Sequence, residues 1–320
     1  MCCFVSRFRL LSFLADAFLF VGLSYVPCAG APAGQQDGNS TSLVKLQAVA
    51  SSGDAAAQFR LAFYLFQTGD PPDYPSILTW LRSSTAQHYA PAQCTLGYLY
   101  EKGLGLHRDY AKAAENYRAA ALQGDSIAQN NLGYLYYTGH GVHKDLRTSF
   151  KWYRAAAEHG DSTGESNLGY LYFHGQGTRH DYAEAAKWFR AAAEQGDYRS
   201  ERVLGYLYYE GLGVPVDYSE AAHWLSLAAQ QGDPHAQGDL GFLYESGKGV
   251  PLDYVTAYVW YSRAMAAGVK AADERRKSIT RLLTPKQLDQ ARTLLTRNEA
   301  RPRTLQQQSA PIASSFVQIH

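Results

Sequence analysis

A five-residue pattern that returns every 36 residues constrains this chain more than any other feature. Leu96-Gly97-Tyr98-Leu99-Tyr100 recurs four more times at that step, and the last copy has Phe242 in place of the first tyrosine. A ladder of aspartates and all five tryptophans keep the same register. Self-similarity of this period predicts a stack of short units, each of which buries its apolar face only against its neighbours.

Each unit predicts two helices joined by a tight turn. In the second clear copy, Leu132 and Leu135 belong to an apolar stripe at helical spacing. Gly139 and Gly141 break this helix, and Asp145 is placed to cap the next one. The aspartate ladder is therefore interpreted as a set of helix starts rather than as carboxylates for catalysis.

The glycines and tryptophans predict how the two helices pack. A glycine in mid-helix, such as Gly133, costs ~1 kcal/mol relative to alanine. The paired helix is therefore expected to cross there, leaving no room for a Cβ. The tryptophans, Trp188 among them, are expected to fill the wider gaps between units together with tyrosines. Leu61-Ala62-Phe63, 35 residues before the first clear copy, marks a divergent first unit.

The combined pattern resembles a known repeat. Leu-Gly-x-Leu-Tyr, Gly-x-Gly, Asp, Ala, Trp, Ala-Ala and Gly at 36-residue spacing is similar to the Sel1-like repeat, a relative of the tetratricopeptide repeat. The resemblance covers about residues 42–283. It implies an all-α, right-handed solenoid of about six repeats with a concave binding face, and a scaffold or adaptor role. Ala62 in place of glycine, and the missing Gly-x-Gly, suit an atypical N-terminal cap.

The first 33 residues predict an export signal. Arg7 and Arg9 precede an apolar run from Leu10 to Val26, and Ala31-Pro32-Ala33 fits the small-x-small cleavage rule. The expected location is therefore secreted or periplasmic, with no integral membrane domain after signal removal. The alternative is a chain that stays anchored to a membrane by this segment.

The remaining boundaries follow from composition and capping signals. Residues 34–42 are predicted as a polar linker and residues 43–283 as the solenoid. Thr284-Pro285-Lys286-Gln287 predicts the start of a capping helix over 284–297. Residues 298–320 lack periodicity and are predicted as a disordered tail.

The sequence contains no strong signal for catalysis, metal or cofactor binding. Lys plus Arg is 30 and Asp plus Glu is 29, so the balanced charge does not suggest nucleic acid. The Gly-x-Gly pairs lack the strand and the Lys-Ser/Thr of a phosphate loop. Ser42-Leu43-Val44-Lys45 matches Ser-x-x-Lys, but no partner motif of a β-lactam enzyme follows. No cofactor and no metal are expected.

The candidate binding residues lie off the buried stripe of each first helix. We call two sets that repeat along the array the polar column and the tyrosine column. The polar column comprises Thr95, Asn131, Asn167, Val203 and Asp239, and the tyrosine column comprises Tyr98, Tyr134, Tyr170, Tyr206 and Phe242. Tyrosine offers rigid contact area with a hydrogen-bonding tip, and asparagine bonds both edges of a peptide backbone. The alternative is that the aromatics only stack between units.

Three function classes remain open from the sequence. The first, a non-catalytic scaffold that binds a protein or peptide on the concave face, follows from the family resemblance. The predicted contacts for that face are Thr95, Tyr98, Asn131, Tyr134, Asn167, Tyr170, Tyr206, Asp239 and Phe242. The second is a secreted hydrolase acting on β-lactams or cell wall. The third is a purely structural or self-assembling protein.

Overall fold

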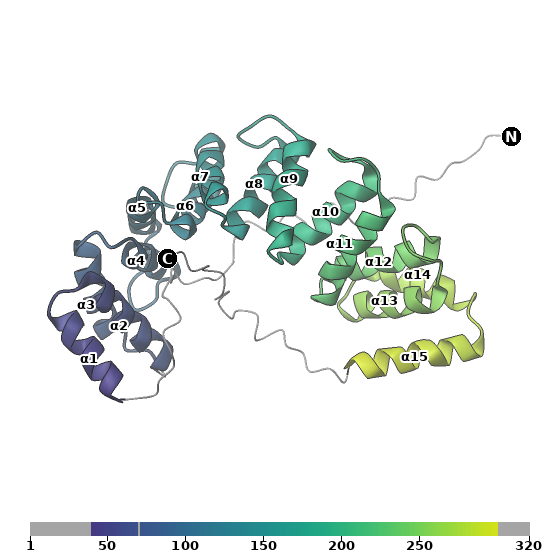
Figure 1. Ribbon diagram of the computed structural model, residues 1–320, viewed down its shortest axis with the longest axis horizontal. Helices are drawn as coiled ribbons and strands as arrows, with labels where there is room; N and C mark the ends of the chain where they lie inside the picture. The colour runs from purple at the N-terminus through teal and green to yellow at the C-terminus, as the bar shows by residue number, and fades with distance from the viewer. Residues whose placement is uncertain (1–39, 70, 300–320) are drawn as a thin grey trace, which may run out of the picture. The chain divides into compact units, whose positions relative to one another are not determined.

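A computed structural model describes residues 40–69 and 71–299, and the regular elements in this part of the chain are all α-helices (Figure 1). The predicted signal peptide, most of the predicted linker and the tail from residue 300 lie outside the described residues. The helices are α1 (Ser40–Ser51), α2 (Ala55–Thr68), α3 (Tyr74–Ala86), α4 (Ala90–Lys102), α5 (Tyr110–Ala121), α6 (Ser126–Thr138), α7 (Leu146–Glu158), α8 (Ser162–His174), α9 (Tyr182–Glu194), α10 (Tyr198–Glu210), α11 (Tyr218–Gln230), α12 (Pro234–Ser246), α13 (Tyr254–Ala266), α14 (Lys270–Thr280) and α15 (Pro285–Glu299).

The described residues form two compact units. The N-terminal unit comprises residues 40–164 with 176–178, and the C-terminal unit comprises 165–175 with 179–299. In both units a repeat consists of a first helix, here called A, and a second helix, called B. The A helices are α2, α4, α6, α8, α10 and α12, and the B helices are α3, α5, α7, α9, α11 and α13. The predicted all-α repeat architecture is confirmed.

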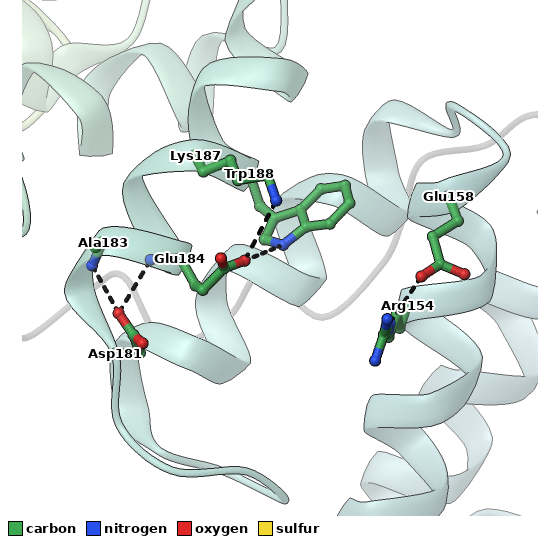
Figure 2. A network of polar contacts seen from close by, with 7 residues as sticks. All are labelled: Arg154, Glu158, Asp181, Ala183, Glu184, Lys187 and Trp188. Atoms are coloured by element: carbon green, nitrogen blue, oxygen red, sulfur yellow. Dashed lines mark hydrogen bonds and ion pairs between the residues drawn. The ribbon is translucent and has the colours of Figure 1, made fainter.

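The aspartates cap helices, as predicted. The Asp125 carboxylate accepts a hydrogen bond from the Ala128 backbone N–H at 2.8 Å and starts the A helix α6. The Asp181 carboxylate accepts from Ala183 and Glu184 at 2.9 and 3.1 Å and starts the B helix α9 (Figure 2). These bonds satisfy backbone donors that the first helical turn leaves unpaired.

The Gly-x-Gly segments are tight turns between the A and B helices. Gly141 has φ +70°, and a Cβ at this position would lie 2.2 Å from the carbonyl carbon of Tyr110. The turn therefore nests against the start of the preceding repeat's B helix, where only glycine fits. The Asp145 N–H closes the turn by donating to the Tyr136 carbonyl at 2.9 Å.

The mid-helix glycines receive a large side chain from the paired B helix. A Cβ on Gly133 would lie 2.8 Å from Cδ1 of Tyr153, which is itself 1% exposed. The predicted close crossing of the A and B helices is confirmed. The ring that packs against the glycine belongs to the residue after the tryptophan position, as Tyr153 follows Trp152. The tryptophans themselves lie less deep than predicted. Trp224 is buried, whereas Trp188 is half-buried and donates its indole N–H to Glu184 at 3.2 Å (Figure 2).

A buried polar side chain at the fourth residue of the A helices links successive helices. Gln58, Gln129 and Gln237 each donate their amide to a B-helix or α1 carbonyl eight residues earlier, at 3.1–3.2 Å. In the second repeat, Gln123 just after α5 donates its amide to the Gln93 side chain at 2.7 Å. Two repeats carry a carboxyl here instead of an amide, Glu165 and Glu201.

Both ends of the described chain carry extra helices. Helix α1 begins at Ser40, inside the predicted linker, because Leu43 and Leu46 pack against the apolar cluster of α1 and α2. At the other end, Thr284 and Gln287 bond each other reciprocally at the start of α15, and α15 buries Ala291 against the core of the C-terminal unit. Helix α15 runs two residues beyond the predicted end at 297.

Candidate partner-binding face

In the N-terminal unit, the A helices α4 and α6 present the candidate residues at half exposure. Thr95 and Tyr98 lie on α4, and Asn131 and Tyr134 occupy the equivalent positions on α6. Their apolar neighbours Leu96, Leu99, Leu132 and Leu135 are at most 5% exposed. The stripe and the columns therefore occupy different sides of each helix, as the periodicity requires.

The polar column also takes part in contacts between repeats. The Tyr117 hydroxyl of α5 donates to Glu101 Oε2 at 2.8 Å, and the Asn131 side chain hydrogen-bonds the same tyrosine. Burial and the adjacent Glu101 carboxylate raise the pKa of Tyr117 well above its usual range. Asn131 thus joins α6 to α5 while it stays only partly buried.

The polar column continues one step beyond the predicted residues, to Arg275. Arg275 Nη1 lies 3.1 Å from Glu245 Oε2, which also accepts the Tyr261 hydroxyl at 2.5 Å. Glu245, Tyr261 and Arg275 therefore repeat the arrangement of Glu101, Tyr117 and Asn131. The sequence signal was present, since Arg275 lies 36 residues after Asp239, but it was missed because the repeat decays there.

Three predicted contacts are buried in the C-terminal unit. Asn167 is 6% exposed, Phe242 is 8% exposed and Asp239 is fully buried. The Phe242 ring is covered by Lys248 and Arg275, whose charged groups lie 6.0 and 4.8 Å from its centre. These side chains offer little or no surface to a partner in this conformation.

Asp239 is buried without a hydrogen bond from any described residue. The B-helix residue that faces Asp239 is Leu225 on α11 of the preceding repeat, which has no hydroxyl to offer where three other repeats carry tyrosine. Burial raises the pKa of Asp239 well above its usual range, while Arg202 lowers it and Asp233 raises it further. Asp239 is therefore a buried packing residue held near an Arg202–Asp233 ion pair of 3.4 Å.

The tyrosine column is half-buried at Tyr98, Tyr134, Tyr170 and Tyr206, two residues in each unit. Lys102 lies 5.7 Å from the Tyr98 ring centre, and His174 stacks at 4.4 Å on Tyr170. Burial and the Glu101 carboxylate raise the pKa of Tyr134. Each of these tyrosine rings contacts side chains of its own repeat and still exposes part of its surface to solvent.

An apolar hollow opens beside Thr95 and Tyr98. We call it the first-repeat hollow, because helices α2, α3 and α4 form it. Its lining comprises Phe59, Ala62, Phe63, Phe66, Ile77, Leu81, Thr95, Tyr98 and Leu99.

Among residues 40–69 and 71–299, no three His, Cys, Asp or Glu side chains come together in a way that could hold a metal ion. Within those same ranges, the helices are all too short or too polar to span a bilayer.

The comparisons with known proteins agree with the geometry. The sequence pattern of the Sel1 repeat matches six stretches of the chain. They are residues 55–87, 90–125, 126–161, 162–197, 199–233 and 234–269. No curated protein is similar enough to this sequence to count as a match.

Two solved structures share both sequence and fold with the chain. A protective antigen of uropathogenic Escherichia coli with an SLR fold is 36% identical over 80% of this chain, with a TM-score of 0.72. This chain spans only 56% of that antigen's length. A Sel1 repeat protein from Oxalobacter formigenes is 33% identical over 72% of this chain and 86% of its own, with a TM-score of 0.58.

Proposed function

The chain belongs to the Sel1 repeat family, and from that premise we propose that it is a non-catalytic scaffold whose A-helix face binds a polypeptide segment of a partner protein. The proposed contacts in the N-terminal unit are Thr95, Tyr98, Asn131 and Tyr134. Tyr170 and Tyr206 are the corresponding contacts of the C-terminal unit. Asn167, Asp239 and Phe242 are left out because they are buried.

One observation carries the proposal. Tyr98 and Tyr134 recur one repeat apart and are both only partly buried, and each lies one turn after a polar residue, Thr95 or Asn131. Tyrosines of this kind supply contact area at low cost in side-chain entropy, and polar neighbours supply adaptable hydrogen bonds. The spacing suits an extended segment that meets the same pair of groups at successive repeats.

The proposal extends to location. The predicted signal in residues 1–33 supports export of the chain, secreted or periplasmic, with retention on a membrane by this segment as the alternative. The Escherichia coli relative is described as a protective antigen, which fits an exported protein. Intact-mass measurement on protein from its source organism tests this, because export with cleavage removes the first ~30 residues. A full-length chain in the cytosol would contradict it.

The binding proposal is tested by a matched pair of tyrosine variants. Partners captured by the wild-type chain from the source extract are re-measured as purified proteins against Tyr134→Ala and Tyr64→Ala. Tyr64 lies outside the column and is 40% exposed. We expect Tyr134→Ala to weaken binding on the order of 30-fold, the loss of ~2 kcal/mol typical of a tyrosine hot spot. Tyr64→Ala should bind as the wild type does.

The competing classes give different results in the same preparation. Equal binding by both tyrosine variants would move the interface away from this face. Nitrocefin turnover would indicate a β-lactam hydrolase, and concentration-dependent light scattering without any partner would indicate self-assembly.

A further inference from the structure

The first-repeat hollow has a closed floor and an accessible mouth. Phe59, Ala62, Ile77, Leu81 and Leu99 form the floor, and each is 1% exposed. The mouth is formed by side chains that are half-buried, namely Phe63, Phe66, Thr95 and Tyr98. Apart from the hydroxyls of Thr95 and Tyr98, the lining side chains are hydrocarbon. A hollow of this kind favours an apolar ligand over water.

The hollow lies where four other repeats carry a ring of their own, while the repeat at residues 199–233 has Leu225 against Gly205. In three other repeats the mid-helix glycine of A accepts a tyrosine ring from B, as Gly97 accepts Tyr117 with a Cβ distance of 2.9 Å. The repeat at residues 162–197 uses Gly169 with Phe189. The first repeat has Ala62 and Leu81 at these two positions.

The surroundings of the missing ring match as well. In the second repeat the Tyr117 hydroxyl reaches Glu101 on the same repeat and Asn131 on the next. The equivalents for the first repeat are Phe66 and Thr95, and both line the hollow. Leu81 stands at the position of Tyr117, and Ile77 stands where the second repeat has Ala113. Both side chains occupy part of that space, and the hollow opens beside them.

We propose that the first-repeat hollow receives one aromatic side chain, a phenyl or phenol ring, from the polypeptide bound on the A-helix face. The inference rests on the proposed function for the source of the ring. The chain's own repeats supply the template, because Tyr117 and Phe189 fill the same place elsewhere. Phe59, Phe63, Phe66 and Tyr98 offer the offset and edge contacts that aromatic rings prefer. A charged side chain is disfavoured, since the lining offers it no counter-charge.

The experiment uses small ring probes on the full chain. Toluene and p-cresol stand for the two ring types, and methylcyclohexane stands for an aliphatic group of similar size. Titrations are followed by methyl NMR of Ile77, Leu81 and Leu99. We expect saturable shifts with toluene and p-cresol, and affinity at least several-fold weaker for methylcyclohexane.

A variant that restores the ring is the matched control. Ala62→Gly with Ile77→Ala and Leu81→Phe reproduces the trio Gly169, Ala185 and Phe189 of a well-packed repeat. This variant should melt no lower than the wild type and should lose the toluene shifts. If it melts lower, the single variant Thr95→Phe blocks the mouth without touching the floor and should also lose them.

Failure of this inference differs from failure of the scaffold proposal. Absent or non-saturable toluene shifts, or unchanged toluene binding in both blocked variants, would overturn the aromatic site. Toluene binding together with full partner binding by the ring-restored variant would overturn the link to the partner. The scaffold proposal depends instead on Tyr134→Ala, a residue that does not line the hollow.

Discussion

Single residues decide where this array responds to pH. Glu201 occupies a position that holds glutamine in four other repeats, is 3% exposed and accepts a hydrogen bond from Gln231 at 2.9 Å. Burial raises the pKa of Glu201 to about 7, the Gln231 hydrogen bond lowers it and Asp197 raises it further. The protonated Glu201 carboxyl can donate a hydrogen bond. The equivalent Gln237 amide donates one to the Ala229 carbonyl.

The pH prediction follows from the direction of that shift. A raised pKa means that the folded state prefers the neutral carboxyl, so its stabilisation is complete below the ordinary value near 4.5 and is lost as pH rises to about 7. We expect Glu201 to contribute a fall on the order of 2 kcal/mol to the free energy of unfolding across this window. Glu201→Gln should remove most of that fall, and Glu194→Gln, at an exposed carboxylate, should leave it intact. Urea titrations from pH 4 to 8 measure both.

The deepest aromatic residues, and not the tryptophans, should dominate stability. Phe189 is 4% exposed and meets Gly169, whereas Trp188 beside it is half-buried on Glu184 (Figure 2). We expect Phe189→Ala to cost ~3–5 kcal/mol and Trp188→Ala ~1–2 kcal/mol, because truncation of a buried ring leaves a cavity. Equal losses of unfolding free energy in denaturant titrations would mean that the tryptophan position stabilises the core as much as the Phe189 position does.

At the scale of helices, the A–B pair depends on complementary sizes at one crossing point. Gly133 with Tyr153, Gly205 with Leu225 and Ala62 with Leu81 are three versions of the same pair of positions. Glycine faces a ring or a leucine, and alanine faces a leucine. The close crossing could be predicted from sequence because the glycine recurs at a helical position that otherwise disfavours it. The filling residue was missed because tryptophan, one residue earlier, is more conspicuous.

A double-mutant cycle tests this complementarity. Gly133→Ala places a Cβ 2.8 Å from the Tyr153 ring and should cost ~1–2 kcal/mol, overpacking outweighing a gain of ~1 kcal/mol in helix propensity. In a Tyr153→Ala background the same change should cost much less. Gly238→Ala is the control, since its nearest neighbour would lie 3.9 Å away, and it should stabilise α12. Additive losses in the cycle would refute the pairing.

At the scale of the whole chain, repeat number and helix starts followed from the sequence, whereas exposure of the columns did not. The 36-residue step and the aspartate caps are local signals. Whether Asn131 or Asp239 faces solvent depends on the facing B-helix residue, tyrosine in one repeat and Leu225 in another, and on helices such as α14 that supply Arg275. The exposure of a column residue therefore cannot be predicted from the column itself, because it depends on residues of neighbouring helices.

The capping helix α15 makes a prediction about where unfolding begins. Its Ala291 is fully buried against the C-terminal core, and Leu288 and Leu295 pack beside it. We expect Ala291→Glu to detach α15 and to speed hydrogen exchange first in α13 and α14, since repeats contact only their neighbours. Exchange in α2–α5 should stay unchanged. A uniform acceleration in all helices would show that the array unfolds as one block.

The nested turn between repeats has a consequence for how such a chain changes length. Asp197 and Asp233 start their A helices in the same way, and the next turn glycine nests on the preceding B helix in each case. Excision of residues 198–233 would join Asp197 to Pro234 and bring α12 onto α9 with the capping residue and both glycines still in frame. Shorter excisions would move the turn glycines away from the B-helix starts against which they pack. The length of the array can therefore change only by whole repeats, and so can the length of any surface that the array presents.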